Sequence, residues 1–409
     1  MNILLINHYA GSLRHGMEYR PFYLAREWVR LGHTVRIIAS SQSHIRAQAP
    51  QLHGQPRLDE TIDGVSYRWI ATPAYRGNGA ARVVNMLAFV AHLQRHARQL
   101  AAEFAPDVVI ASSTYPLDIW PAHRIARLAG ARLLFELHDL WPLSPIELGG
   151  YSRWHPFIML LQAAENYACR NACAIVSILP KVRDHLEAHG MAPHKLHIVP
   201  NGADPAEWLA EPPALSGQAG TVLAALRHEG KFIVGYAGTH GVANALDTLL
   251  DAAALVADQR IAFVLAGGGP DKPRLAHLAR ERGLHHVHFL DPVPKEQVPA
   301  LLACFDVAYI GWQRQRLYRY GIAPNKLIDY MMAGRPILHS VEAGNDPVAD
   351  ARCGLTVAPQ DPAAVAHGLL ALFTLDPYER EAAGQRGRAY AMANLSYPVL
   401  GRRFLQACA

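Results

Sequence analysis

Cysteine is scarce in this sequence, and a dense stripe of Lys and Arg is absent. The five cysteines are an odd number, lie in apolar stretches and include no C-x-x-C pair. This pattern argues against a disulfide framework and indicates the reduced thiols of a cytosolic protein. No uninterrupted apolar stretch reaches the ~18 residues that a transmembrane helix needs. We therefore expect that any membrane contact is peripheral.

The charge balance is only mildly basic, with 39 Lys and Arg against 34 Asp and Glu. A dedicated nucleic-acid binder would carry a stronger basic patch, so we expect no nucleic-acid partner and favour phosphorylated ligands or anionic lipid. The N-terminus also lacks the cationic region and apolar run of a signal peptide, and its residues 2–7 predict a buried strand. We expect a cytoplasmic protein.

The 409 residues, 51% of them hydrophobic, are enough for two large cores. Short apolar runs alternate with helix-length segments, a pattern that predicts parallel sheets covered by helices on both faces. The predicted strands are 2–7, 34–39, 65–70, 107–112, 132–137, 173–178 and 196–199 in the first half, and 232–238, 261–269, 287–290, 306–310, 335–340 and 354–359 in the second.

The predicted fold class is therefore α/β, with two tandem Rossmann-like domains that face a central cleft. The first domain is expected over residues 1–199 and the second over 221–376, joined by a Pro/Gly-rich linker at 200–220. Residues 377–409 predict C-terminal helices that pack back across the domain junction.

The most informative stretch is IAPNKLIDYMMAGRPIL, residues 322–338. Pro324 suits the first turn of a helix, which places Asn325 and Lys326 near the positive N-terminus and Asp329 one turn later. A helix N-terminus beside a lysine attracts phosphate, and a carboxylate one turn on can accept hydrogen bonds from a sugar diol. An ordinary capped helix with an i,i+3 Lys–Asp pair would have the same spacing.

This stretch, followed by AGNDPVADARCGLTVAPQD, resembles the donor-binding region of family-4 retaining glycosyltransferases of the GT-B fold. The segments FAPDVVIASS, FELHDLWPLSP, KLHIVPNGAD, YAGTHG and LAGGGP are similar to the same family in the same order, and so is the opening βαβ unit. The resemblance covers nearly the whole chain and implies an N-terminal acceptor-side domain and a C-terminal domain that binds a nucleotide sugar.

Within that resemblance, Asp329 matches the second Glu of the family's E-x7-E pattern, which holds the ribose of the donor. Gly321 stands where the first Glu is expected, so backbone groups from Gly321 through Ile322 to Ala323 are candidates to replace its contact to the donor sugar. YAGTHG lacks the family's Arg and Lys for the diphosphate. Lys326 is the candidate substitute, together with an arginine of the preceding loop, Arg314, Arg316 or Arg319; a solvated basic loop is the alternative for these arginines.

Other donor contacts come from loops after predicted strands. Gly238 and Thr239 follow a strand and precede a helix, where backbone N–H groups can point at phosphates. Gly16 belongs to an HGME segment that resembles the family's GGME-like turn, and Val293 matches a segment that lies against the nucleotide base. A plain turn is the alternative at each glycine.

His138 ends a predicted strand, and the resemblance makes it the residue that touches the donor sugar near the reacting centre; a structural histidine is the alternative. His92 and His96, and the cluster at residues 285–288, lack a nearby carboxylate or Cys for a metal set. There is no Asp-x-Asp motif either. We therefore expect no metal and no cofactor.

The resulting prediction is a metal-independent, retaining hexosyl- or N-acetylhexosaminyl-transferase that moves a sugar from a UDP-sugar to a polysaccharide or polyprenyl-linked acceptor. A UDP-sugar 2-epimerase of the same fold and a non-catalytic, sugar-nucleotide-binding partner of other transferases remain alternatives. Residues 80–100, with Arg82, Arg95 and Arg98, and residues 151–161 predict contact with an anionic membrane, the alternative for 80–100 being a core helix with a basic end.

Overall fold

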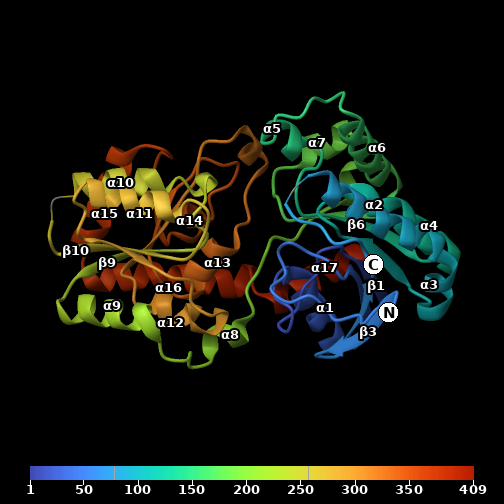
Figure 1. The fold of residues 1–409 in the computed structure, drawn as a ribbon, viewed down its shortest axis with the longest axis horizontal. Coiled ribbons are helices and arrows are strands. Elements are labelled where there is room, and N and C mark those ends of the chain that lie inside the picture. The colour runs from blue at the N-terminus through green and yellow to red at the C-terminus, as the bar shows by residue number, and fades with distance from the viewer. Residues whose placement is uncertain (78, 257) are drawn as a thin grey trace. The chain divides into compact units, whose positions relative to one another are not determined.

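The computed structural model describes residues 1–77, 79–256 and 258–409. The chain forms two compact units: unit 1 contains Met1–Pro200 and Tyr397–Ala409, and unit 2 contains Asn201–Ser396 (Figure 1). Each unit is built on one mostly parallel sheet, which confirms the predicted class of two Rossmann-like α/β domains. No helix in the described ranges has the length and apolar character needed to cross a membrane.

Unit 1 has a sheet in the order β3-β4-β2-β1-β5-β6-β7-β8, with every neighbouring pair parallel except β3 and β4. Its strands are β1 (Asn2–Ile6), β2 (Thr34–Ser40), β3 (Arg57–Ile62), β4 (Val65–Ile70), β5 (Val108–Ala111), β6 (Arg132–Leu137), β7 (Ala174–Ser177) and β8 (Leu196–Ile198). Its α-helices are α1 (Arg20–Arg30), α2 (Ala80–Arg95), α3 (Ala97–Phe104), α4 (Ile119–Ala129), α5 (Leu143–Glu147), α6 (Pro156–Asn171), α7 (Arg183–Ala188) and α17 (Tyr397–Cys408).

The antiparallel hairpin of β3 and β4 was not predicted from the sequence. Asp63 and Gly64 form its turn with φ values of 49° and 81°, the pair of positive angles that a tight type I′ hairpin turn needs. The Asp-Gly dipeptide before VSYRWI is a known hairpin signal. The preceding strand RLDETI is polar and its exposed residues alternate with less exposed ones, so it lacks the apolar run on which the other strands were recognised.

Unit 2 has a sheet in the order β11-β10-β9-β12-β13-β14, parallel throughout. Its strands are β9 (Phe232–Ala237), β10 (Ile261–Ala266), β11 (Val287–Leu290), β12 (Val307–Gly311), β13 (Ile337–Ser340) and β14 (Gly354–Thr356). Its α-helices are α8 (Pro205–Leu209), α9 (Gly217–His228), α10 (Leu246–Leu255), α11 (Lys272–Glu281), α12 (Val298–Ala303), α13 (Asn325–Met332), α14 (Pro347–Ala351), α15 (Pro362–Thr374) and α16 (Pro377–Asn394).

The segment 200–220 contains α8 and the start of α9, and from Asn201 onward it belongs to unit 2. Its first residues pair with the end of α16: the Ala203 N–H donates to the Leu395 carbonyl at 3.0 Å, and Ala203 forms a parallel bridge with Ser396. The two places where the chain enters and leaves unit 2 are thus hydrogen-bonded to each other.

The C-terminal helix α17 completes the core of unit 1. Phe404 is fully buried, and its ring centroid lies 4.9 Å from that of Trp28 on α1. The Trp28 Nε1 donates to the Gly401 carbonyl at 3.1 Å, and Tyr397 stacks on Tyr23. Residues as far as 373 positions apart, such as Trp28 and Gly401, therefore share one hydrophobic core, from which the end of the chain cannot be removed without opening a cavity.

We predict that Phe404→Ala lowers the free energy of unfolding of unit 1 by about 3–5 kcal/mol, because it leaves an aromatic-sized cavity against Trp28. Urea denaturation followed by tryptophan fluorescence measures the change. Gln406→Ala, at an exposed position of the same helix, is the matched control and should leave stability nearly unchanged. Equal stability of the two variants would contradict the role of α17 in this core.

Candidate functional site

Two glycine loops pack backbone against backbone at the carboxyl ends of β9 and β10. The His240 N–H donates to the Gly268 carbonyl at 2.7 Å. A Cβ atom on Gly267 would lie 1.9 Å from the Gly238 carbonyl oxygen, and one on Gly269 would lie 2.3 Å from the His240 carbonyl oxygen. Glycine is therefore required where these loops meet, and the loops lie at the sheet edge where α/β domains bind ligands.

Lys326, in the first turn of α13, reaches the β9 loop. Its ammonium donates to the Tyr236 hydroxyl at 2.9 Å and to the Asn244 side-chain carbonyl at 2.7 Å, and it lies 4.6 Å from the centroid of the Tyr236 ring. A Cβ atom on Gly238 would be 3.2 Å from the same nitrogen. The helix thus holds a cation directly beside the glycine loop.

The partners of the Lys326 ammonium are all neutral. Burial lowers its pKa to about 8, because little water solvates the charge. Among the described residues, no Asp or Glu forms an ion pair with it, whereas Lys272 in the same unit pairs with Asp291 at 2.7 Å. Lys326 therefore keeps its charge available for an anion that enters the site.

Asp329 lies one turn further along α13 and is half-buried. Burial raises the pKa of its carboxyl group to about 7, with the charge of Lys295 opposing and that of Glu207 adding to the shift. Lys295 and Glu207 form an ion pair with each other. The carboxyl group of Asp329 is thus protonated more readily than that of an exposed Asp. A hydrogen bond donated to it by a ligand hydroxyl would favour its charged form.

The loop that leads into α13 is fixed by side-chain amides. The Ile322 N–H donates to Asn345 Oδ1 at 2.7 Å, and the Asn345 amide returns a bond to the Ile322 carbonyl at 3.1 Å. The Asn201 amide donates to the Ala323 carbonyl at 2.8 Å, and the Gly321 N–H donates to Tyr318. Several of the backbone groups predicted to replace the missing Glu are therefore already bonded within the protein.

Arg314 and Arg319, two of the three arginines predicted for this region, contact their own neighbours. The Arg314 guanidinium lies 3.6 Å from the Glu342 carboxylate, and Arg319 donates to the Arg316 carbonyl at 2.6 Å and stacks over Tyr320. Arg314 and Arg319 are both exposed. Neither is among the residues hydrogen-bonded to Lys326 in the described structure.

The remaining predicted donor residues lie around these loops. The Thr239 carbonyl accepts hydrogen bonds from the Tyr236 hydroxyl at 2.7 Å and from the Asn244 amide at 2.9 Å, which links it to the partners of Lys326. Asn325 is exposed at the start of α13, and Val293 packs partly buried against the core. The structure thus brings Gly238, Thr239 and Lys326 together.

A second polar cluster lies in unit 1, at the carboxyl ends of β5 and β6. Glu136 is fully buried and accepts hydrogen bonds from Arg20 Nε at 2.9 Å and Ser112 Oγ at 2.7 Å. His138 Nε2 lies 3.3 Å from the same carboxylate and 3.0 Å from Ser112 Oγ. Desolvation opposes ionisation of Glu136, yet His138, Arg20 and Ser112 together lower its pKa to about 2. A charged carboxylate therefore orients the imidazole of His138.

Gly16 occupies a closed turn in unit 1. Its N–H donates to the Ser12 carbonyl at 2.8 Å, its φ is 91°, and a Cβ atom would lie 2.9 Å from Ala47. A glycine at this position is explained by the backbone angle and the close approach of Ala47. No interaction within unit 1 joins Gly16 to His138 among the contacts of the described residues.

Sequence reasoning missed an aromatic cluster around the end of β1. His8 is fully buried and its Nδ1 lies 2.5 Å from the Tyr115 hydroxyl, and burial lowers its pKa to about 3. Arg82 Nε donates to the Tyr9 hydroxyl at 3.0 Å, and the guanidinium lies over the rings of Tyr9 and Trp141. Arg82, one of the three arginines predicted to contact a membrane, thus lies against these rings. The spacing of residues within the helix could not reveal this contact.

The comparisons with known proteins agree with this arrangement. The family described as "Glycosyl transferase 4-like domain" matches residues 15–202, and the family described as "Glycosyl transferases group 1" matches residues 231–374. The chain is also 24% identical over 225 residues to WcaI of Escherichia coli (strain K12), which is named for glycosyl transfer in colanic acid biosynthesis. That alignment spans 54% of this chain and 53% of WcaI, about half the length of each.

Solved structures share the fold over the full length. Sucrose-phosphate synthase from Thermosynechococcus elongatus has a TM-score of 0.71 at 17% identity, covering 99% of this chain and 97% of its own. Anabaena Alr3699/HepE, solved in complex with UDP-glucose, has a TM-score of 0.67 at 15% identity, covering 99% and 98%. WaaG, titled a glycosyltransferase involved in lipopolysaccharide biosynthesis, has a TM-score of 0.66 at 16% identity, covering 98% and 98%.

The two family matches fall on successive parts of the chain, one almost entirely in unit 1 and the other within unit 2. Both are glycosyltransferase families, and their order along the chain is the order that the sequence motifs predicted. The chain therefore belongs to the family-4 glycosyltransferases of the GT-B fold.

Proposed function

We propose that this protein is a retaining glycosyltransferase that moves a sugar from a UDP-sugar to a polysaccharide or lipid-linked oligosaccharide acceptor. The observation that carries the proposal is the Lys326 ammonium, held by neutral partners beside the glycine loop of β9. A diphosphate supplies the negative charge that this cation lacks. The similar fold of a protein solved with UDP-glucose supports uridine as the base, and the names of WcaI and WaaG support a surface-polysaccharide acceptor.

In the proposed reaction, the acceptor hydroxyl attacks the anomeric carbon from the face on which the diphosphate leaves. The new bond joins the acceptor oxygen to that carbon, the bond from the carbon to the phosphate oxygen breaks, and the acceptor proton passes to the leaving diphosphate. Lys326 stabilises the charge that develops on the diphosphate, and the Asp329 carboxylate accepts hydrogen bonds from the ribose. No protein nucleophile and no metal ion is required.

The test is incubation of the purified protein with a panel of radiolabelled UDP-sugars, with and without a polyprenyl-linked acceptor. Labelled lipid product with retained anomeric configuration supports the proposal. One alternative is a binding protein without activity, which the presence of Gly321 in place of the family's first Glu favours. Such a protein would bind UDP but would neither transfer nor hydrolyse the donor sugar. A 2-epimerised UDP-sugar as the product would instead indicate an epimerase.

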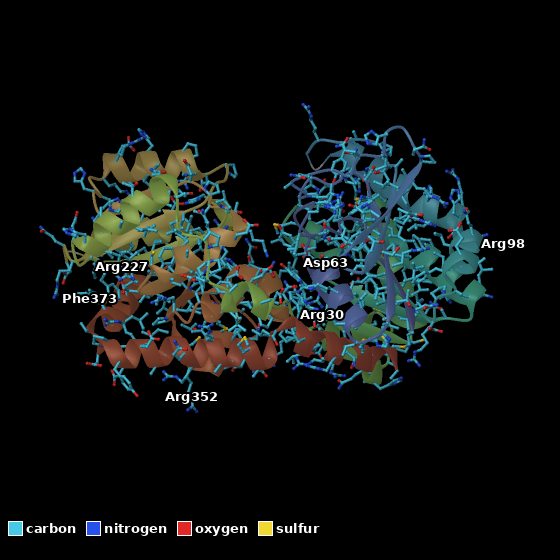
Figure 2. The ribbon with its side chains drawn as sticks, turned by 90° about the horizontal axis from the view of Figure 1, so that it is seen from below. Arg30, Asp63, Arg98, Arg227, Arg352 and Phe373 are labelled. Atoms are coloured by element: carbon cyan, nitrogen blue, oxygen red, sulfur yellow. The ribbon has the colours of Figure 1, made fainter. Side chains whose placement is uncertain are left out.

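We also propose that unit 1 contacts an anionic membrane at the cytoplasmic face. On α2, Val84 is 55% and Leu87 42% exposed, and Trp154, just before α6, is 75% exposed. Arg95 is exposed at the end of α2, and Arg98 projects from the outside of unit 1 (Figure 2). Exposed apolar side chains can insert at the membrane interface, and the attraction of arginines to anionic headgroups adds to that binding.

For the donor site, we predict that Lys326→Ala weakens UDP binding at least about tenfold, because the diphosphate loses a charge-assisted contact. The pKa of Lys326 is lowered to about 8, so its charge is present below that pH and is lost above it. The affinity of the wild-type protein for UDP, measured by calorimetry, should fall as the pH rises above 8. The affinity of Lys326→Ala for UDP should not show this fall. Identical profiles would contradict the assignment.

For Asp329, we predict that Asn raises the Kd for UDP several-fold, because an amide accepts ribose hydroxyl bonds less strongly than a carboxylate. The Kd for the 2′,3′-dideoxy analogue should be nearly the same in both proteins. Asp350→Asn, on an exposed position of α14, is the matched control. A variant that binds UDP normally would remove Asp329 from the ribose site.

For metal independence, we predict that the Kd for UDP changes by less than about twofold between buffer with EDTA and buffer with Mg²⁺. The reason is that Lys326 and the helix N-terminus, not an ion, would neutralise the diphosphate. Calorimetry with the wild-type protein measures both values. Binding that requires Mg²⁺ or Mn²⁺ would contradict the proposed chemistry.

For the membrane, we predict that Arg95→Gln with Arg98→Gln lowers binding to anionic vesicles roughly tenfold or more and leaves the weak binding to neutral vesicles unchanged. Co-sedimentation with vesicles of phosphatidylglycerol or phosphatidylcholine measures this. Arg280→Gln with Arg402→Gln, two exposed arginines elsewhere, is the control pair. Equal loss in both double variants would exclude docking through α2 and α3.

A further inference from the structure

A cluster of two imidazoles and a carboxylate lies in unit 1, between α6 and α7. Glu165 comes from the middle of α6, and His185 and His189 come from one face of α7 and its C-terminal end, four residues apart. The potential ligand atoms of the three side chains all lie within 4.8 Å of one another. Figure 1 shows α6 and α7 side by side in this unit.

The distances match the edges of a tetrahedral metal site. His185 Nε2 lies 2.8 Å from Glu165 Oε1, and His189 Nε2 lies 3.9 Å from Glu165 Oε2. Ligands at ~2.0–2.1 Å from zinc in a tetrahedron are separated by about 3.3 Å, which falls between these two values. Small side-chain rotations would therefore bring all three atoms to bonding distance, and the proton that His185 Nε2 shares with Glu165 Oε1 would be released to solvent as zinc binds.

The surrounding hydrogen bonds prepare the ligands. His189 Nδ1 lies 2.7 Å from the His185 carbonyl, which can only accept a hydrogen bond, so Nδ1 carries the proton and Nε2 keeps a free lone pair. The Gln162 amide donates to Glu165 Oε2 at 2.8 Å and holds the carboxylate. Outer hydrogen bonds of this kind orient the ligands of metal sites.

Burial and charge also favour a cation. The side chain of Glu165 is 0% exposed, that of His185 is 8% and that of His189 is 24%, so an ion can enter from the His189 side. In the described part of the chain, Glu165 forms ion pairs with these histidines and with no Lys or Arg. A buried carboxylate without a permanent cation needs compensation, which a divalent ion supplies.

We propose that Glu165, His185 and His189 bind one Zn²⁺, with water in the fourth position, and that the ion links α6 to α7. Imidazole and carboxylate ligands in a small, partly buried site suit zinc better than Mg²⁺ or Ca²⁺, which require six or more oxygen ligands. All three ligands belong to unit 1, and none of them is among the residues proposed to bind the donor.

A second pair of histidines provides a matched control. His92 and His96 on α2 have the same spacing, stacked rings 4.2 Å apart, and the same contact of His96 Nδ1 with the His92 carbonyl, at 2.9 Å. Among the described residues, no carboxylate joins them in a cluster as Glu165 joins His185 and His189. Burial and then His96 lower the pKa of His92, and nearby Arg57, Arg68 and Arg95 lower it further. This pair should bind zinc weakly.

The test is zinc binding by the metal-free full-length protein, measured by competition with a chromogenic chelator, together with the absorption spectrum after Co²⁺ addition. We expect one zinc per chain, a tetrahedral Co²⁺ spectrum, and a zinc-dependent rise in the thermal unfolding temperature. His189→Gln should weaken binding at least about tenfold and abolish the rise, and His96→Gln should do neither.

His189→Gln is the decisive variant because its side chain is the most exposed of the three, so the fold should tolerate the change. Circular dichroism of both variants confirms that they are folded. The proposal is wrong if the wild-type protein binds no zinc, or if His189→Gln and His96→Gln bind it equally. An unchanged zinc affinity in His189→Gln would show that Glu165 and the histidines form an internal hydrogen-bonded cluster only.

Discussion

The position of one ammonium group governs the proposed chemistry of this protein. Lys326 is held by a phenol and an amide, both neutral, in a place where burial lowers its pKa to about 8. A cation in such surroundings is stabilised strongly by an incoming anion, because little water solvates it and no carboxylate of the described residues pairs with it. The family usually supplies further basic residues to the diphosphate, and the β9 loop of this chain lacks them. In the function that we propose, Lys326 consequently carries a larger share of that task.

The fold explains how Lys326 meets the glycine loop. Parallel strands bring their carboxyl ends to one edge of the sheet, so the loops after β9 and β10 and the start of α13 converge although they are far apart in sequence. Gly267 and Gly269 allow the two loops to approach without Cβ atoms, and Tyr236 at the end of β9 turns its hydroxyl toward Lys326. In unit 1, Glu136 and His138 lie at the carboxyl end of β6, the corresponding edge of that unit's own sheet. There the carboxylate of Glu136 sets the orientation of the His138 imidazole.

The sequence predicted the features that are local in the chain. Apolar runs placed the strands of both sheets except the polar strand β3, and the segment at 322–338 placed Lys326 and Asp329 on one helix. It could not predict features that depend on distant partners. The Tyr236 and Asn244 contacts to Lys326, the packing of α17 on Trp28 and the turn of Arg82 toward Tyr9 all join segments that periodicity treats separately. Glu165, His185 and His189 were missed for the same reason, because the carboxylate lies on another helix from the two histidines. The pair His92 and His96 is visible in the sequence, but no carboxylate of the described residues forms such a cluster with it.

We propose that Lys326 recognises the diphosphate and not the nucleoside. The most direct measurement is the affinity of wild-type protein and Lys326→Met for UDP and for uridine, by calorimetry at pH 7. Lys272→Met is the control, because that lysine lies in the same unit but already pairs with Asp291. We predict that Lys326→Met loses at least about tenfold in affinity for UDP and none for uridine, and that Lys272→Met loses no affinity for UDP. An equal loss for UDP and uridine, or none for either, would contradict it.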